Sequence, residues 1–297
     1  MELLQNKFGK NLIVKENLSK YSWFNLGGPA DIFFRPETKQ QLIEFLNEIK
    51  NSNFKIFILG AGSNTLIRDS GVKGVVIKLG SKFSDIKLLE KDKIEVGAAT
   101  LDKKVSNFAK DNGIADLEFL SCIPGSIGGA VIMNSGCYGS DISKILISIR
   151  VIDYNGNEKE IKSNDIKFFY RGTNLPDNYI LLSAILQGTV SSTKIIEKKQ
   201  EELIQKKKKT QPSQIKTGGS TFKNTKDQKA WALIKETGSD KLYVGDAKIS
   251  EKHCNFFVNN GLAKASDIEK LINKVKKEVY SKTGEELELE IKIIGDD

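Results

Sequence analysis

In the first half of the chain, the spacing of apolar residues predicts helices that alternate with short strands. Thr38 suits a helix N-cap and Gln41 completes a capping box. The residues that follow at the helical interval are Leu42, Phe45, Leu46 and Ile49. Apolar runs predict strands over residues 55–59, 74–79 and 94–97, and a helix over residues 100–112 that Gly113 stops. This mixture is typical of α+β or α/β proteins.

The second half carries a strong hairpin signal. Residues 145–154 alternate between apolar and polar, and Asn155-Gly156 then predicts a type I′ turn before a partner strand ending at Lys162. Further predicted elements are a strand over 179–187, a lysine-rich helix over 193–209, a helix over 230–237 and strands over 254–258 and 287–294. Ser266 and Glu269 form a predicted capping box for the last helix. Its predicted inward residues are Ile268, Leu271, Ile272, Val275 and Val279.

Length and composition narrow the protein class. A chain of 297 residues with 39% hydrophobic and 28% charged residues is long enough for two or three globular domains. No apolar run approaches a membrane span, and the first residues lack a signal pattern, so we expect a cytoplasmic protein. Three cysteines without CxxC spacing and one histidine argue against a disulfide framework and against a metal site.

The charge balance favours a negatively charged partner without identifying it. Lysine and arginine exceed aspartate and glutamate by 46 − 38 = 8. Such a surplus fits nucleic acid, a membrane surface or a phosphorylated substrate. Part of it lies in the run Lys206 to Lys209, which we expect to be a solvated helix face. No aromatic residues interleave with these lysines, which weakens a single-strand nucleic-acid groove.

Two glycine-rich segments are suited to holding phosphate groups. The first is Gly60-Ala61-Gly62-Ser63-Asn64, which follows a strand but matches neither the dinucleotide fingerprint nor a Walker loop. The second is Pro124-Gly125-Ser126-Ile127-Gly128-Gly129, and Asn134 extends its unusual backbone. Glycine lets backbone amides approach a phosphate closely. Two such loops suit a diphosphate held from both sides, as in a flavin dinucleotide.

Three polar positions outside these loops could carry chemistry. Arg171 follows Tyr170 just before a loop, and its ordinary interpretation is a surface cation. Ser220 lies in a glycine turn and could be a simple turn serine. Glu290 alternates with Glu286 and Glu288 on one predicted strand face, which could be merely solvated. Singly, none of the three supports a function.

Together, these segments resemble the UDP-N-acetylenolpyruvoylglucosamine reductase family, also called UDP-N-acetylmuramate dehydrogenases, over nearly the whole chain. The matching motifs are LGGPAD at 26–31, LGAGSN at 59–64, LEF at 117–119, IPGSIGGA at 123–130, MNSG at 133–136, YR at 170–171, GGSTFKN at 218–224, HCNF at 253–256 and EIKIIG at 290–295. The short length resembles the compact second type of the family. Departures from its usual pattern are Cys122 for glycine, Ser135 for alanine, Thr225 for proline and Trp231 for glycine.

The resemblance implies an α+β fold with three regions. An FAD-binding region of the vanillyl-alcohol-oxidase and p-cresol-methylhydroxylase type would span about residues 26–192, in subdomains 1–82 and 83–192. A substrate domain over residues 193–297 would follow, with its last strand returning to the flavin site. FAD would be held by Gly60, Ala61, Gly62, Ser63, Asn64, Pro124, Gly125, Ser126, Gly128, Gly129 and Asn134.

The resemblance also implies a reaction in peptidoglycan precursor synthesis. NADPH would reduce FAD, and flavin N5 would then give hydride to the vinyl C3 of UDP-N-acetylenolpyruvoylglucosamine. Arg171 and Glu290 would stabilise the resulting enol, and Ser220 would deliver a proton to C2. The implied substrate-binding residues are Tyr170, Lys223, Asn224, His253 and Asn255. We expect a monomer without nucleic-acid or membrane partners.

Two alternatives stay open at this point. One is an FAD-dependent oxidase or dehydrogenase of a small alcohol or hydroxy acid. The other, from a different class, is a basic nucleic-acid-binding module, which would also explain the net charge of +8. A flavin absorption spectrum of the purified protein separates the second alternative from both flavoenzymes.

Overall fold

The structure is a computed structural model and describes residues 1–296. The chain divides into two compact units. Unit 1 comprises Met1–Ile13, Phe33–Ala61 and Val76–Lys207, and unit 2 comprises Val14–Ile32, Gly62–Val75 and Lys208–Asp297. The chain passes from one unit to the other within β1 (Leu12–Asn17), β2 (Pro29–Phe34) and β5 (Val72–Ile77). The three-region division stays a prediction.

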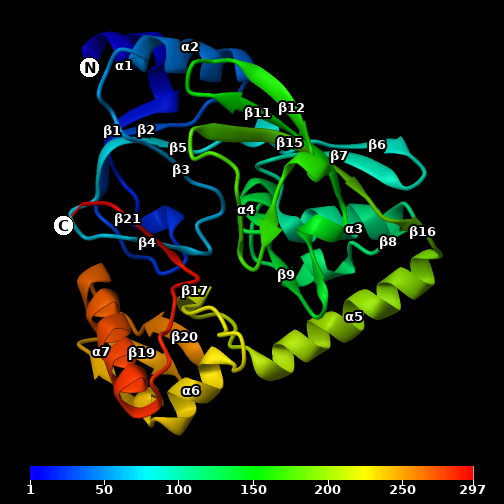
Figure 1. The fold of residues 1–297 in the computed structure, drawn as a ribbon. Coiled ribbons are helices and arrows are strands. Elements are labelled where there is room, and N and C mark those ends of the chain that lie inside the picture. The colour runs from blue at the N-terminus through cyan, green and yellow to red at the C-terminus, as the bar shows by residue number, and fades with distance from the viewer. Residues whose placement is uncertain (297) are drawn as a thin grey trace. The chain divides into compact units, whose positions relative to one another are not determined.

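Unit 1 is built on a five-stranded sheet of order β12-β11-β15-β7-β6 (Figure 1). Its strands are β6 (Ile86–Glu90), β7 (Lys93–Gly97), β11 (Leu146–Asp153), β12 (Glu158–Lys162) and β15 (Tyr179–Gln187). All neighbours in this sheet are antiparallel. Apolar residues of α3 (Asp102–Asp111) and α4 (Ile127–Ile132) share one core with the sheet. The predicted strand over 179–187 is confirmed to the residue.

Helix α2 (Lys39–Ile49) of unit 1 confirms Thr38 as the predicted N-cap. The predicted capping box does not form, because the Gln41 side chain accepts a 2.9 Å hydrogen bond from the Glu37 amide and not from Thr38. The Thr38 hydroxyl accepts a 3.2 Å hydrogen bond from the Gln41 backbone amide. Its four predicted inward residues are buried: Leu42, Phe45, Leu46 and Ile49. The same unit contains α1 (Glu2–Phe8), β3 (Ile56–Ile58), β8 (Ile114–Ala115), β9 (Gly136–Cys137), β10 (Ser140–Asp141), β13 (Phe168–Phe169), β14 (Gly172–Thr173) and β16 (Thr189–Val190). Helix α5 (Thr193–Thr210) lies mostly in unit 1.

Unit 2 combines a second sheet with two helices (Figure 1). The sheet has the order β17-β20-β19-β18 and is antiparallel throughout. Its strands are β17 (Lys216–Ser220), β18 (Tyr243–Val244), β19 (Ala247–Ser250) and β20 (His253–Asn259). Helices α6 (Ala230–Glu236) and α7 (Ala265–Thr283) contribute to one core with it. The five predicted inward residues of α7 are all buried.

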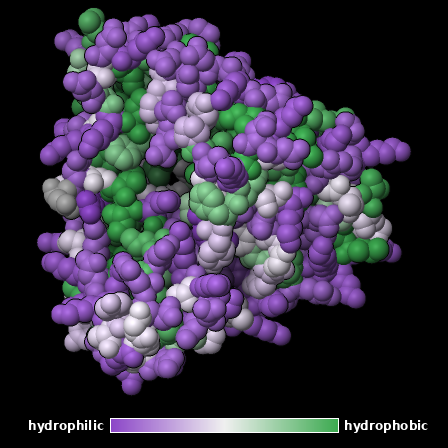
Figure 2. Space-filling view, viewed as in Figure 1, coloured by the Kyte–Doolittle hydropathy of each residue, from purple (hydrophilic) through white to green (hydrophobic). Residues whose placement is uncertain are grey.

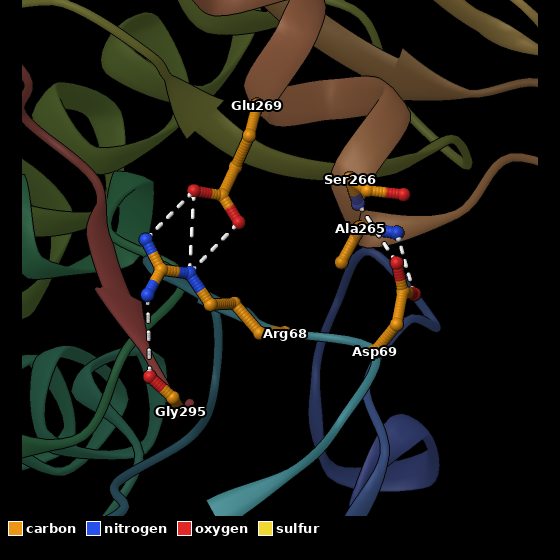
Figure 3. Close-up of polar contacts among 6 residues, drawn as sticks. All are labelled: Arg68, Asp69, Ala265, Ser266, Glu269 and Gly295. Atoms are coloured by element: carbon orange, nitrogen blue, oxygen red, sulfur yellow. Dashed lines mark hydrogen bonds and ion pairs between the residues drawn. The ribbon is translucent and has the colours of Figure 1, made fainter. Parts of the chain in front are cut away.

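A segment from the first quarter of the chain completes unit 2. Strand β4 (Thr65–Ile67) pairs in parallel with β21 (Lys292–Ile294). Directly after β4, the Asp69 carboxylate accepts hydrogen bonds of 2.8 and 2.9 Å from the first two amides of α7, those of Ala265 and Ser266 (Figure 3). Arg68 forms an ion pair with Glu269, at 3.0 Å between Nε and Oε1. The start of α7 is therefore fixed by residues far away in the sequence.

This arrangement corrects the predicted capping box of α7. Glu269 does not reach back to the helix start, because its carboxylate is paired with Arg68. The helix begins two residues earlier, with Lys264 as N-cap, and the Asp267 carboxylate accepts a 2.9 Å hydrogen bond from the Lys264 amide. The sequence pattern predicted the apolar face of α7 correctly, but it assigned the capping role to the Glu269 carboxylate instead of the Asp267 carboxylate.

Two further local predictions were wrong in detail. The hairpin of β11 and β12 forms, but Asn155 is absent from the residues with positive φ, so its turn is not type I′. Instead, the Asp153 carboxylate accepts hydrogen bonds from the amides of Asn155 and Asn157, and Gly156 alone has a positive φ, of 84°. The last strand, expected over 287–294, is limited to β21, with a single bridge at Leu289 before it.

The surface is largely hydrophilic over the face seen in Figure 2. In the described part of the chain, every helix is too short or too polar to cross a membrane. We expected the lysine run at the end of α5 to be solvated, but this holds for only part of it. Lys207 is half-buried, and its ammonium group donates a 2.9 Å hydrogen bond to the Cys122 carbonyl. Lys206 lies 5.0 Å from the centre of the Tyr138 ring.

Candidate functional site

The first glycine loop begins in unit 1, where β3 ends. Within residues 1–296, the backbone amides of Gly60 and Ala61 donate no hydrogen bond to the protein. The carbonyl of Gly60, by contrast, accepts a hydrogen bond from the Lys78 ammonium group. Burial, together with the nearby charge of Arg35, lowers the pKa of Lys78. The Gly60 carbonyl is therefore already hydrogen-bonded, whereas the Gly60 and Ala61 amides are available to bind a ligand.

The second glycine loop lies against the first. A Cβ atom added to Gly60 would lie 2.8 Å from the Ser126 hydroxyl, and Ser126 is only 4% exposed. Among the described residues, the amides of Gly125, Ser126 and Gly129 also have no acceptor within the protein. This side of unit 1 thus gathers five unpaired amides: Gly60, Ala61, Gly125, Ser126 and Gly129.

A buried acid lies beneath the second loop. Asp102 is fully buried, and neither carboxylate oxygen has a hydrogen-bond partner among the described residues. A Cβ atom added to Gly125 would lie 2.5 Å from one of those oxygens, so the loop requires glycine there. Burial raises the pKa of Asp102 well above its usual range. A neutral carboxyl group at this position does not repel an anion held by the loop.

These features fit the diphosphate of a dinucleotide. Clustered backbone amides without acceptors form a cradle for phosphate oxygens. Glycine at positions 60 and 125 is required by close approach, since larger residues would meet Ser126 and Asp102. The residues present therefore fit FAD, and the loop contacts predicted for Pro124 and Gly129 stay predictions. The Gly128 amide does not fit this role, because it donates a 2.9 Å hydrogen bond to the Ala98 carbonyl.

The rest of the first loop belongs to unit 2 and has a second role. Gly62 has a φ of 71°, and a Cβ atom there would lie 1.8 Å from the Tyr21 carbonyl oxygen. The Asn64 side chain, predicted to bind the cofactor, donates a 3.1 Å hydrogen bond to the Glu290 carbonyl. The Asn64 carbonyl accepts one of 2.9 Å from Lys292. Asn64 therefore fixes the backbone of an implied catalytic residue, and Ser63 lies beside it in the loop.

Arg171 occupies a strained position in unit 1. It is the second residue of the two-residue turn between β13 and β14, and its φ is 60°. This left-handed conformation costs a non-glycine residue about 1–2 kcal/mol. The Asn134 side chain donates a 3.3 Å hydrogen bond to the Phe169 carbonyl at the base of the turn. The Arg171 guanidinium lies 5.0 Å from the centre of the exposed Tyr170 ring. Residues that their neighbours hold in strained backbone conformations are common at functional sites.

Ser220 lies beside a β-bulge in unit 2. Between Thr217 and Ser220, strand β17 has one residue more than β20 opposite it, and Gly219 in this bulge has a φ of 80°. A Cβ atom at Gly218 would lie 2.4 Å from the Phe24 ring, so both glycines are required. Bulges of this kind change the direction of a side chain and are common next to active sites.

Glu290 is hydrogen-bonded to the residue that directly follows β17. Its amide donates a 2.8 Å hydrogen bond to the carbonyl of Thr221, the residue after Ser220. The Thr221 amide donates in turn to the Asn255 carbonyl, at 2.7 Å. The buried Asn255 side chain makes both its hydrogen bonds with Phe222, to the amide at 2.9 Å and to the carbonyl at 2.7 Å. Asn255 thus holds the Ser220 segment, while its predicted substrate contact stays untested.

The other implied substrate residues of unit 2 lie around this segment. Lys223 pairs with Glu288 at 3.3 Å. The Asn224 side chain accepts a 3.2 Å hydrogen bond from the Ala230 amide at the start of α6. His253 is half-buried, and burial lowers its pKa. Its Nδ1 accepts a 3.3 Å hydrogen bond from the Asn255 amide.

Sequence reasoning missed two residues of the first unit. Lys78 directly follows the apolar end of β5, and Asp102 begins α3 directly after a threonine and a leucine. For Lys78, a charged residue at the end of a buried run was the available signal. Asp102 follows the exposed Leu101 and gave no such signal. Sequence also gave no indication that Asn64, Asn134 and Asn255 each hold the backbone of a segment that carries one implied catalytic residue.

Comparison with known proteins covers nearly the whole chain. Residues 30–162 match the family model of an FAD binding domain, and residues 211–294 match that of the UDP-N-acetylenolpyruvoylglucosamine reductase C-terminal domain. The reductase of that name from Pelagibacter ubique is 48% identical over 292 residues, which cover 97% of this chain and 96% of the relative. The one from Wolbachia pipientis wMel is 42% identical over 279 residues, which cover 94% of each.

A solved structure agrees in fold. The crystal structure of UDP-N-acetylenolpyruvylglucosamine reductase from Thermus caldophilus superimposes with a TM-score of 0.83 at 32% identity. The match covers 95% of this chain and 97% of that one. The predicted α+β fold with an FAD-binding region is confirmed. Identity, coverage and fold agree, and the chain belongs to the UDP-N-acetylenolpyruvoylglucosamine reductase family.

Proposed function

We propose that this chain reduces UDP-N-acetylenolpyruvoylglucosamine to UDP-N-acetylmuramate, with FAD as bound cofactor and NADPH as electron donor. Family membership and the paired glycine loops support this assignment over the flavin oxidase and the nucleic-acid-binding module. FAD, when bound, supplies the hydride chemistry, while the protein supplies position and electrostatics. We also propose that the protein acts as a monomer in the cytoplasm.

The observation that carries the proposal is the link between Ser220 and Glu290. The Glu290 amide donates a 2.8 Å hydrogen bond to the carbonyl of Thr221, which directly follows Ser220 in the chain. A hydroxyl and a carboxyl group are therefore held on adjacent backbone segments of one unit. In our proposal, Ser220 donates its proton to C2 of the enolpyruvyl group, which becomes strongly basic once C3 has accepted hydride. Glu290 is a hydrogen-bond partner for the enol that develops beside it.

Arg171 completes the proposed set. Its planar guanidinium group matches a carboxylate through two parallel hydrogen bonds, and the substrate carries a carboxylate on the reacting group. The left-handed turn, held by Asn134, limits the positions that the arginine backbone can adopt. Less reorganisation is then needed when charge develops in the reaction.

Stopped-flow measurement of the two half-reactions tests this function. We expect Arg171→Ala and Glu290→Gln to slow flavin reoxidation by substrate by roughly 10²–10³-fold and to leave flavin reduction by NADPH nearly unchanged. Their proposed charge partners are present only in the second half-reaction. Arg150→Ala and Glu286→Gln are matched controls, since both residues are exposed and lie outside the proposed site.

Three results would argue against the proposal. Equal damage to both half-reactions would indicate a general folding or binding role for Arg171 and Glu290. Equal turnover of an enolpyruvyl sugar that lacks the UDP group would contradict the substrate assignment. Release of FMN rather than FAD from the heated protein would contradict the diphosphate cradle.

A further inference from the structure

Lys78 brings a positive charge to the first glycine loop. Strands β3 and β5 are neighbours in one sheet, and the Leu59 amide donates a 2.9 Å hydrogen bond to the Ile77 carbonyl. Gly60 and Lys78 are the next residues along these two segments, and the Lys78 ammonium group donates a hydrogen bond to the Gly60 carbonyl. The Lys78 amide is itself bonded to the Phe34 carbonyl, at 2.9 Å. The strand ends therefore fix this charge beside the loop.

This charge lacks an acidic partner. Within residues 1–296, Lys78 forms no ion pair, although it is half-buried. The Glu37 carboxylate is engaged elsewhere, since its oxygens lie 3.9 Å from Arg35 and accept a 3.2 Å hydrogen bond from the Ser81 amide. Burial and the positive charge of Arg35 both lower the pKa of Lys78. A buried charge without a counter-ion is unfavourable, so a bound anion would stabilise the charged form of Lys78.

Backbone donors beside Lys78 fit the same anion. The amides of Gly60 and Ala61 have no acceptor within the described chain, and both residues are partly exposed. Gly125 of the second loop is also partly exposed with an unpaired amide, and its neighbour Ser126 lies against Gly60. Amide dipoles hold phosphate oxygens, but they carry no net charge to balance that of a diphosphate. A cation beside these amides supplies the charge that they lack.

We propose that Lys78 is a further cofactor-binding residue, whose ammonium group balances part of the negative charge of the FAD diphosphate. This role rests on the FAD cofactor proposed above. An ammonium group has three N–H donors, and Lys78 uses one of them on Gly60, so two stay available for phosphate oxygens. The bond to Gly60 has a second effect. It covers a carbonyl oxygen that would otherwise repel a phosphate group held by the amides of Gly60 and Ala61.

Titration of the deflavinated full-length protein with FAD tests this role by binding rather than by turnover. We expect Lys78→Gln, which keeps a hydrogen-bond donor for Gly60 but loses the charge, to lower FAD affinity by roughly tenfold or more. Lys78→Arg should recover part of the affinity, because the charge returns. Lys55→Gln is the matched control and should leave FAD affinity unchanged. Lys55 is exposed and lies directly before β3, at the opposite end of that strand from Gly60.

Salt dependence separates the charge of Lys78 from support of the loop fold. In wild type, FAD affinity should fall as the sodium chloride concentration rises, because salt screens the attraction between the ammonium group and the diphosphate. The same plot for Lys78→Gln should be shallower. Riboflavin, which lacks the diphosphate, should bind wild type and Lys78→Gln equally. A loss of FAD affinity with an unchanged salt slope would assign Lys78 a purely structural role and overturn the proposal.

Two other ligands of the proposed reaction also carry a diphosphate, namely the UDP-linked substrate and NADPH. Titration of the flavin-loaded protein with UDP and with NADPH distinguishes these sources. We expect wild type and Lys78→Gln to bind each of them equally. A loss of UDP or NADPH affinity without a loss of FAD affinity would overturn the assignment of Lys78 to FAD.

The outcomes for FAD separate this inference from the proposed function. Wild-type protein that fails to bind FAD would contradict the proposed function itself. Equal FAD affinity of wild type and Lys78→Gln would overturn the role of Lys78 alone. If Lys78→Gln folds poorly, acetylation of wild-type lysines by acetic anhydride still tests the role. Bound FAD should then lower the labelling of Lys78 relative to that of Lys55, and unchanged labelling of Lys78 would overturn the proposal.

Discussion

The side-chain amide of Asn64 donates a 3.1 Å hydrogen bond to the backbone carbonyl of Glu290. A loop that the sequence assigned to the cofactor therefore also fixes an implied catalytic residue. Asn134 does the same for the turn that carries Arg171, and Asn255 for the strand that carries Ser220. Asparagine suits this task because its amide both donates and accepts, as backbone does.

Replacement of Asn64 by alanine should misplace Glu290. The lost hydrogen bond is worth about 1 kcal/mol, so we expect flavin reoxidation by substrate to slow roughly five- to tenfold. Flavin content should fall little, because the loop amides are unchanged. Ser63→Ala, one position away, serves as the control. Stopped-flow absorbance and the flavin-to-protein ratio measure the two effects. A variant that loses flavin but keeps its reoxidation rate would mean that Asn64 acts mainly on the cofactor.

Gly60→Ala should weaken FAD binding. The new methyl group would lie 2.8 Å from the Ser126 hydroxyl, which has little room to move at 4% exposure. We expect at least a tenfold loss of FAD affinity, measured by titration of the deflavinated protein. Ser126→Ala in the same chain removes the clashing oxygen and should recover part of the affinity. No recovery in the double variant would show that the two loops act independently.

Ser220→Ala should retain the flavin and its reduction by NADPH. Reoxidation by substrate should slow by roughly 10²–10⁴-fold, because the proton donor is gone. Ser220→Cys should recover part of the rate. Thr221→Val is a suitable control, since the Thr221 hydroxyl is buried without a partner among the described residues and valine has the same shape. In D₂O, wild type should place deuterium at C2 of the product. Full activity in Ser220→Ala would assign the acid to another group.

Asp69→Asn should destabilise unit 2. Burial opposes ionisation of Asp69, but hydrogen bonds from the Ser266 and Ala265 amides outweigh it and lower its pKa. A carboxylate with a lowered folded-state pKa contributes stability above its unfolded pKa, and this is lost as pH falls through the folded value. We therefore expect wild type to exceed the variant by about 1 kcal/mol near neutral pH, with the difference shrinking below about pH 4.

Urea unfolding at several pH values measures this difference. Glu251→Gln is the control, because Glu251 is exposed and its removal changes the net charge equally. A difference between wild type and Asp69→Asn that stays constant from neutral to acidic pH would contradict the proposed role of the Asp69 charge.

Local patterns predicted those elements whose stability depends on their own sequence. The apolar faces of α2 and α7 follow from helical periodicity, because each helix buries one side. The limits of β15 follow from its apolar run. The predicted type of the turn at Asn155 was wrong for a local reason, because the Asp153 carboxylate accepts hydrogen bonds from the turn amides. The predicted capping role of Glu269 was wrong because of a residue distant in sequence: Arg68, with which Glu269 pairs, precedes it by 201 residues.

The candidate site shows the same division. Glycine loops and the Tyr170-Arg171 pair were visible as motifs. The contacts that orient them were not, because Asn64 and Glu290 are 226 residues apart and Asn255 and Phe222 are 33 apart.

The three-segment composition of unit 2 has a consequence for its synthesis on the ribosome. Residues 14–32 and 62–75 emerge early, but their partners in β21 and α7 emerge only after all of unit 1. At about 5–20 residues per second, these segments wait more than ten seconds for those partners. Unit 1 is complete at Lys207, whereas unit 2 closes only after β21 has been made. A chain stalled after Lys207 therefore exposes apolar residues such as Phe24 and Leu66, which makes it a target for chaperones and proteases.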